Sequence, residues 1–530
     1  MNTTSSSNHV DPRAVLLEAA RRLQRGELSA AEQACDQLLR AAPREPEALH
    51  LAGLIAHRRG DLAGAKSKLR KTVEIHPRVA RFHNSLGVVL RDLGEAESAR
   101  RTLERAIRLR PGFAGAYYNL GLVHEDLGDH RSALWAYETA CEHDPGMAGV
   151  HHARGMVLQM LGRLDEARDA FRRALDIQPA YPEAHFHLAH ARRAEQADDP
   201  QLAQIESLVA QRDWPPRETG WLYSALGKLN DDLARYDRAI EAHHRANQVT
   251  GVKHDPEARD EWAGHLIESF SAKRLRQGSD AALARADRIF IVGMPRSGTT
   301  LLEAMLARHP SVAAGGERME LQAALTEAAE TLGLRKPRQW AEAGPEAMQQ
   351  AAKILDRHLD TPSGASMLID KLPGNVWRLG LVGLLMPRAP ILFTWRDPRD
   401  VGLSCYFTRF EKGQNFSYDL YHCGRQIQTV QRLTDHWLAA LPNPVRVVSY
   451  EKLVTEPDNT IRDALDCCGL DPSEPADGHA AQEVVTTASS WQVRQGLYRR
   501  AINRWRHYEA HLEPLLRGLG STPLEQPPQG

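Results

Sequence analysis

A short polar loop lies between an apolar, β-branched run and a stretch of good helix formers, an order that creates an anion site. The run from Ile289 to Gly293 is typical of a buried strand, and a helix is expected from Leu301. In such a turn the backbone N–H groups converge at the helix N-terminus, where the helix dipole also favours an anion. The expected anion-binding residues are Arg296, Ser297, Gly298, Thr299 and Thr300. Taken alone, the same string also fits a plain strand-to-helix turn.

A second apolar run, Ile391 to Trp395, ends at Arg396 and leads into a predicted helix that carries Ser404. Ligands of open α/β sheets bind beyond the carboxyl ends of the strands, so we expect the Arg396 guanidinium to bind a second phosphate. Two anion sites predict a bis-phosphorylated nucleotide. The first loop lacks the Gly-Lys-Ser/Thr of ordinary P-loop NTPases, which disfavours ATP hydrolysis and ranks a kinase last.

The two segments IFIVGMPRSGTTLL and ILFTWRDPRDVGLSCYF resemble the 5′-phosphosulfate and 3′-phosphate loops of sulfotransferases. The donor of that family is 3′-phosphoadenosine 5′-phosphosulfate (PAPS). Within the family the sequence is most similar to the protein-tyrosine sulfotransferase branch, through Gly316-Glu317 and through Asp370-Lys371-Leu372-Pro373. The similarity spans roughly residues 287 to 510.

This resemblance implies a role for each matched residue. Glu317 would act as the catalytic base on the acceptor hydroxyl. Lys371, together with Arg296, would stabilise charge on the departing bisphosphate without a required metal. The donor would contact Arg296 to Thr300 and four to five further side chains: Arg396, Ser404, Tyr450, Ser489 and Arg504.

Each implied role has a simpler alternative. Glu317 is also read as a helix-terminal or surface carboxylate, and Lys371 as a solvated lysine at a strand end. Tyr450 is equally a packing residue and Ser404 a solvent-facing one. The branch's membrane anchor and paired cysteines are not evident, and residues 318 to 360 show no correspondence. The acceptor is therefore left open between a protein tyrosine and a carbohydrate, lipid or small metabolite, and a non-catalytic scaffold that binds nucleotide is the third hypothesis.

The first half of the chain shows a 34-residue period instead of chemistry. Helix-terminating glycines, small alanines and closing prolines each recur at this step. The columns are Gly26, Gly60, Gly94, Gly128 and Gly162; Ala31, Ala65, Ala99, Ala133 and Ala167; and Pro43, Pro77, Pro111, Pro145 and Pro179. With the YYNLG stretch from Tyr117, this pattern resembles the tetratricopeptide repeat, and residues 218 to 250 carry a degenerate copy.

Stacked helix pairs expose a concave groove that suits a protein or peptide partner. One column of that groove is predicted at His50, Asn84, Tyr118, His152 and Phe186. The alternative is that these are ordinary side chains with no fixed ligand.

Composition restricts the remaining function classes. Lys plus Arg total 67 and Asp plus Glu total 68, so a basic surface that collects nucleic acid is not expected. No apolar run approaches the roughly 18 residues that span a bilayer, and the N-terminus does not resemble a secretory signal. We therefore expect a soluble, cytoplasmic protein.

The expected fold is multidomain, with an all-α tetratricopeptide-repeat solenoid followed by an α/β, P-loop-like sulfotransferase domain around a central parallel sheet. The predicted parts are a disordered N-terminus, a repeat array, a helical connector, the sulfotransferase domain and a disordered tail. Their boundaries are 1–10, 11–196, 197–285, 286–518 and 519–530.

Overall fold

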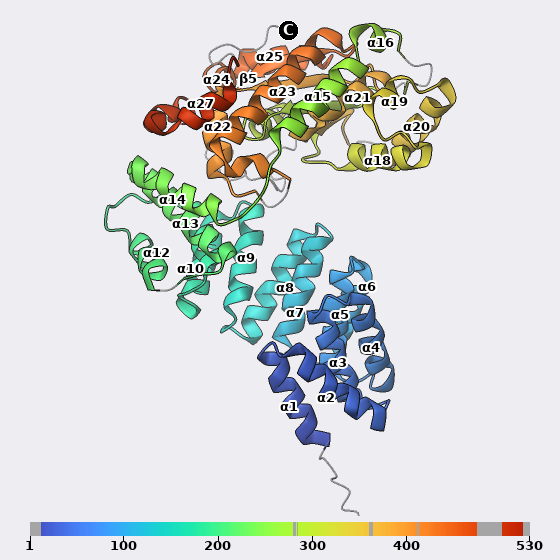
Figure 1. The fold of residues 1–530 in the computed structure, drawn as a ribbon, viewed down its shortest axis with the longest axis vertical. Helices are drawn as coiled ribbons and strands as arrows, with labels where there is room; N and C mark the ends of the chain where they lie inside the picture. Colours follow the sequence, from blue (N-terminus) through green and yellow to red (C-terminus); the bar gives the residue numbers. More distant parts are fainter. Residues whose placement is uncertain are drawn as a thin grey trace, which may run out of the picture. The chain divides into compact units, whose positions relative to one another are not determined.

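Paired helices followed by a mixed helix and sheet region make up the computed structural model (Figure 1), which describes residues 12–211, 213–278, 282–283, 285–359, 364–410, 413–473 and 501–522. The chain divides into two units, one of residues 1–159 and 163–181, the other of residues 160–162 and 182–530. The predicted domain boundaries differ from this division and stay a prediction.

The first unit consists of antiparallel helix pairs, as the 34-residue period predicts. The helices are α1 (Pro12–Gln24), α2 (Leu28–Ala41), α3 (Pro46–Arg58), α4 (Leu62–Ile75), α5 (Ala80–Asp92), α6 (Ala96–Leu109), α7 (Ala114–Asp126), α8 (His130–His143), α9 (Ala148–Met160) and α10 (Leu164–Ile177). The five glycines between the helices of each pair have φ between +75° and +81°, a conformation that costs glycine little. The predicted all-α solenoid is confirmed.

A second glycine column explains how closely the paired helices pack. A Cβ atom on Gly53, Gly87, Gly121 or Gly155 would lie 2.7, 2.6, 2.3 or 2.5 Å from a side chain 16 residues later. Those side chains are Leu69, Leu103, Tyr137 and Phe171. Only glycine fits these positions without movement of the neighbouring helix.

The degenerate copy also forms a helix pair, α13 (Pro216–Asp232) and α14 (Tyr236–Gln248). A Cβ atom on Gly227 would lie 2.5 Å from Nε2 of His243, again 16 residues later. Ala234, with φ of +56°, occupies the turn. The pair therefore keeps the packing rule of the repeats, and it belongs to the second unit.

The second unit contains a five-stranded parallel sheet with the order β2-β3-β1-β4-β5. The strands are β1 (Arg288–Gly293), β2 (Val312–Ala314), β3 (Met367–Asp370), β4 (Ile391–Trp395) and β5 (Val445–Ser449). In β1, Phe290 and Val292 face one core and Ile289 and Ile291 the other. Both faces of the sheet are therefore covered, which explains the continuous apolar runs of the sequence. The predicted central parallel sheet is confirmed.

Helices precede and surround this sheet. Those before β1 are α11 (Pro182–His190), α12 (Pro200–Gln211), α13, α14, α15 (Pro256–Ser269) and α16 (Ala272–Arg276). Those after β1 are α17 (Thr299–Leu306), α18 (Glu320–Leu332), α19 (Pro337–Ala341), α20 (Pro345–His358), η1 (Pro373–Arg378), α21 (Leu379–Leu385), α22 (Pro398–Phe407), η2 (Asn415–Tyr418), α23 (Leu420–Ala440), α24 (Tyr450–Thr455), α25 (Pro457–Cys467), η4 (Arg504–His511) and α27 (Glu513–Leu519). Among the described residues, none of the helices combines the length and the apolar character needed to cross a bilayer.

Candidate active site

Most of the side chains singled out in the sequence follow the carboxyl ends of strands. The loop with Arg296 follows β1, Lys371 follows β3, Arg396 follows β4 and Tyr450 follows β5. Glu317 lies three residues beyond the end of β2. Because all five strands are parallel, these ends share one edge of the sheet. In open α/β sheets that edge is where ligands bind.

The loop between β1 and α17 has the backbone conformation of an anion-binding turn. Arg296 has φ of +68° and Gly298 has φ of +101°, and α17 begins at Thr299. A Cβ atom on Gly298 would lie 2.6 Å from Cδ2 of Tyr450, so a larger residue cannot fit without movement. The Ser297 hydroxyl donates to the carbonyl of Met294 at 2.6 Å, which anchors the loop from inside. The backbone amides are thus held around one point at the start of α17.

Arg296 carries a buried positive charge on this loop. Its Nε donates to Oγ of Ser404 on α22 at 3.0 Å. Burial lowers the pKa of Arg296 to about 10, and the nearby charges of Arg396 and Arg504 act in the same direction. The guanidinium stays charged at neutral pH, and an anion placed beside it would relieve the repulsion among these cations.

Arg396 connects the two predicted anion sites. Its NH1 donates to the Arg296 carbonyl at 3.1 Å, and its NH2 donates to the Ala501 carbonyl at 2.6 Å. The guanidinium lies over the ring of Tyr450, 4.7 Å from the centroid, and only 8% of Arg396 is exposed. Its Nε is buried without a hydrogen-bond partner among the described residues. A buried, unpaired donor beside the anion loop fits a phosphate group of a bound nucleotide.

Glu317 and Lys371 form an ion pair at the same edge. Lys371 Nζ donates to Glu317 Oε1 at 3.0 Å and lies 3.9 Å from Oε2 of Glu303 on α17. Lys371 is fully buried, whereas 47% of the Glu317 side chain is exposed. The carboxylate is therefore accessible to an incoming hydroxyl, while the ammonium group is fixed behind it. This arrangement suits proton removal beside a stabilising cation.

Ser489 and Arg504 stand apart from the other candidates. Ser489 lies outside the described residues. Arg504 NH2 lies 2.7 Å from Oδ2 of Asp231 on α13, and its guanidinium lies over the ring of Phe407, 5.1 Å from the centroid. Contact of Arg504 with a donor molecule stays a prediction.

Two acidic residues of the site were missed in the sequence. Glu303 accepts a hydrogen bond from the Gly316 N–H at 2.7 Å and thereby holds the backbone next to Glu317. Asp400 accepts from the N–H groups of Asn503 and Trp505, each at 2.8 Å. The signal for Glu303 was an acidic residue within the apolar helix TTLLEAML, and the signal for Asp400 was its place four residues after Arg396.

Comparisons with known proteins give matches in both units. Residues 288–474 match the model of the sulfotransferase family, and residues 16–80, 65–112, 84–148 and 118–182 match the model of the tetratricopeptide repeat. An uncharacterized protein of Aquifex aeolicus (strain VF5) is 30% identical over 351 residues, which cover 62% of this chain and 46% of that protein. The chain thus spans about half the length of this relative.

Two further relatives match the second half of the chain. Protein-tyrosine sulfotransferase 2 of Gallus gallus is 25% identical over 274 residues, which cover 45% of this chain and 71% of that protein. Protein-tyrosine sulfotransferase 1 of Danio rerio is 24% identical over 274 residues, which cover 45% of this chain and 74% of that protein.

Proposed function

We propose that this chain, which carries tetratricopeptide repeats followed by a sulfotransferase domain, transfers the sulfuryl group of PAPS to an acceptor hydroxyl. The observation that supports this most strongly is the link between the two anion sites, where Arg396 NH1 donates to the carbonyl of Arg296. One rigid arrangement thus offers a main-chain anion loop and a second guanidinium, which suits a nucleotide phosphorylated at two positions.

The residues of the chain would divide the donor between them. The loop from Arg296 to Thr300 would hold the 5′-phosphosulfate, and Arg396, Ser404 and Tyr450 would contact the bisphosphorylated adenosine. The bound donor supplies the sulfuryl group. Ser489 and Arg504 remain predicted members of this pocket.

Transfer would then depend on Glu317, Lys371 and Arg296. Glu317 accepts the proton of the acceptor hydroxyl while the acceptor oxygen forms its new bond to sulfur. The bond between sulfur and the bridging oxygen breaks, and adenosine 3′,5′-bisphosphate leaves. Lys371 and Arg296 stabilise the negative charge that develops on that oxygen. These steps use protein side chains alone, and we expect them to need no metal.

A protein tyrosine is the acceptor that we favour, because two of the relatives are named protein-tyrosine sulfotransferases. A carbohydrate, lipid or small metabolite is the second candidate, and a scaffold that binds nucleotide without turnover is the third. The accessible carboxylate of Glu317 next to the buried Lys371 favours an enzyme over the scaffold. Cytoplasmic location stays a prediction.

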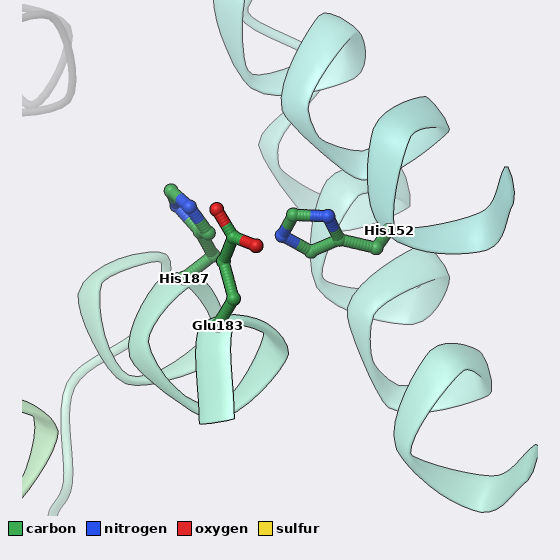
Figure 2. Close-up of side chains that lie close together, drawn as sticks. All are labelled: His152, Glu183 and His187. Carbon is green, nitrogen blue, oxygen red and sulfur yellow. The ribbon is translucent and has the colours of Figure 1, made fainter. Parts of the chain in front are cut away.

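The repeats would recruit the protein acceptor or a partner protein. In the first unit, Nε2 of His50 lies 2.9 Å from Oγ of Ser85, and Asn119 donates to Asn84 at 2.9 Å. His152 projects from α9 (Figure 2). Polar side chains therefore recur at the predicted groove positions of the first unit.

The predicted groove column ends on α11, in the second unit. There Phe186 packs against Trp221, with ring centroids 4.5 Å apart. Glu183 and His187 lie one helical turn apart on this helix and project from it together (Figure 2). These side chains add aromatic and titratable groups to the expected recruiting surface.

The test is sulfate transfer from labelled PAPS to panels of tyrosine peptides and glycans, with the full chain and in the presence of a chelator. We expect label on the tyrosine peptides and no effect of the chelator. Label on glycans alone would establish the second candidate. Nucleotide binding without transfer to any acceptor would favour the scaffold, and magnesium-dependent ATP consumption would favour a kinase.

A further inference from the structure

The backbone from Ala501 to Trp505 is fixed to the edge of the sheet that carries the candidate site. Arg396 NH2 donates to the Ala501 carbonyl at 2.6 Å. The carboxylate of Asp400, on α22, accepts from the N–H groups of Asn503 and Trp505. Asn503, with φ of +60°, turns the chain between these two bonds. The Cα position of Arg504 is therefore set by the same elements that hold Arg396.

The side chain of Arg504 extends from this fixed backbone to α13, one of the helices before the sheet. Its NH2 lies 2.7 Å from Oδ2 of Asp231, and 28% and 20% of the two side chains are exposed. The hydroxyl of the fully buried Tyr508 donates to Oδ1 of the same carboxylate. Both oxygens of Asp231 are thus engaged by η4, which holds the carboxylate in one orientation.

The charge of Asp231 supports this geometry. Burial raises the pKa of Asp231, but the Arg504 charge and the hydrogen bonds from Tyr508 and Arg504 outweigh it and hold the pKa below its ordinary value. The carboxylate is therefore ionised at neutral pH. The charge of Arg504 in turn lowers the pKa of Arg296, which places the Arg504 guanidinium close to the anion loop.

Three cations thus gather at one edge of the sheet, and two of them have a carboxylate partner. Asp400 lies 3.8 Å from Arg396 and Asp231 lies 2.7 Å from Arg504. Fixed carboxylates of this kind reduce the repulsion among the arginines and restrict their rotamers, so that less entropy is lost when an anion binds.

We propose that Asp231, on α13, is a positioning residue that holds Arg504 in the donor pocket. The proposal rests on the proposed function, because it assigns Arg504 to the binding of PAPS. The helix pair α13 and α14 is then part of the sulfotransferase active site, even though sequence analysis assigned it to a connector.

The test compares two aspartates that pair with the same η4 segment. Asp237 on α14 lies 2.8 Å from Nε2 of His511, and 94% of its side chain is exposed. Asp231→Asn should weaken binding of adenosine 3′,5′-bisphosphate to the full chain by about tenfold, because Arg504 loses the charge that orients it. Asp237→Asn should leave this affinity unchanged. In transfer assays, Asp231→Asn should raise the KM for the donor more than it lowers kcat.

A double-mutant cycle separates positioning from general support of the fold. If Asp231 acts through Arg504, then Asp231→Asn should have no further effect on bisphosphate affinity in an Arg504→Gln background. Additive effects of the two changes, or an unchanged affinity of Asp231→Asn, would overturn the proposal.

Tyr508→Phe is the second variant, in case Asp231→Asn does not fold. It removes the hydroxyl that orients the Asp231 carboxylate and keeps the Arg504 pair, so it should weaken binding by a smaller factor, and unchanged affinity would contradict the role of Asp231. Failure of the wild-type chain to bind the bisphosphate would instead refute the proposed function. Intact wild-type binding with an unaffected Asp231→Asn would refute the role of Asp231 alone.

Discussion

Glu317 and Lys371 illustrate how neighbouring side chains can divide one chemical task. The lysine is fully buried and contacts one carboxylate oxygen of Glu317 at 3.0 Å, with Glu303 behind it at 3.9 Å. Burial of the ammonium group is offset by two acidic neighbours, so its charge is held in place without reaching into solvent. The half-exposed Glu317 is the member of the pair that a substrate hydroxyl can reach.

The variant Glu317→Gln tests the role of the base. Because glutamine cannot accept the proton, we expect transfer to fall by about 10² to 10⁴-fold, while binding of adenosine 3′,5′-bisphosphate changes little. Turnover is measured with labelled donor, and binding by calorimetry. Glu327→Gln, on the exposed face of α18, is the matched control and should be fully active. Unchanged turnover in Glu317→Gln would remove this residue from the mechanism.

Arg396→Ala tests the second anion site. We expect the dissociation constant of the bisphosphate to rise by about 100-fold, since a buried guanidinium that contacts phosphate and fixes the Arg296 carbonyl is lost. Arg388, exposed at the opposite end of the same strand, provides the control in Arg388→Ala. Equal affinities of the two variants, measured by titration calorimetry, would contradict a phosphate site at Arg396.

Asp370 predicts a pH dependence of stability. Burial raises its pKa to about 7, with the charges of Arg288, Arg318 and Arg378 opposing that rise. In the unfolded chain its pKa is about 3.9, so the native state keeps a proton that the unfolded state loses. Its contribution to stability is therefore complete below about pH 4 and is lost as the pH rises through about 7.

The variant Asp370→Asn cannot ionise and should not show this loss. The free energy of unfolding of Asp370→Asn relative to wild type should increase between pH 5 and pH 7, by up to about 1.4 kcal/mol per pH unit. Urea unfolding at several pH values measures this difference. A difference that stays constant with pH would show that Asp370 is ionised in the folded protein.

At the scale of elements, packing of the repeats was predictable because it is local. The 34-residue period places each glycine near a side chain 16 residues later, and the distances at Gly53, Gly87, Gly121 and Gly155 confirm that close approach. The strand, loop and helix around Arg296 were likewise predictable from their apolar runs and their glycine. These features depend on residues that are close in the sequence.

Gly121→Ala tests the packing of one helix pair. The added Cβ would lie 2.3 Å from Cε1 of Tyr137, so we expect a loss of about 1 to 3 kcal/mol of stability from overpacking. Gly149→Ala is the matched control, since a Cβ there meets nothing within 4 Å and alanine favours a helix by about 1 kcal/mol. Thermal unfolding should therefore shift in opposite directions, and a stabilising effect of Gly121→Ala would contradict the packing argument.

The parts of the site that the sequence did not reveal depend on long-range contacts. Asp231 on α13 meets Arg504 on η4, and Asp400 on α22 meets the backbone of Asn503 and Trp505. No local pattern distinguishes these aspartates from solvated ones. Their partners come together only when η4 packs against α13 and α22, which no periodicity or turn signal specifies.

At the scale of the whole molecule, the sheet and the helices α11 to α14 belong to one unit, and the repeats α1 to α10 lie mainly in the other. The chemistry is concentrated at one edge of the sheet because parallel strands bring their carboxyl ends together. The repeats offer an extended surface for a partner or acceptor. Donor binding and acceptor recruitment are thus assigned to separate parts of the chain.

The most direct test is titration calorimetry of the full chain with adenosine 3′,5′-bisphosphate, ADP and ATP. The 3′-phosphate is the group that the bisphosphate has and the other two nucleotides lack, and Arg396 is the residue expected to bind it. We predict that the bisphosphate binds at least about tenfold more tightly than ADP or ATP. Equal or tighter binding of ADP or ATP would contradict a donor site for PAPS.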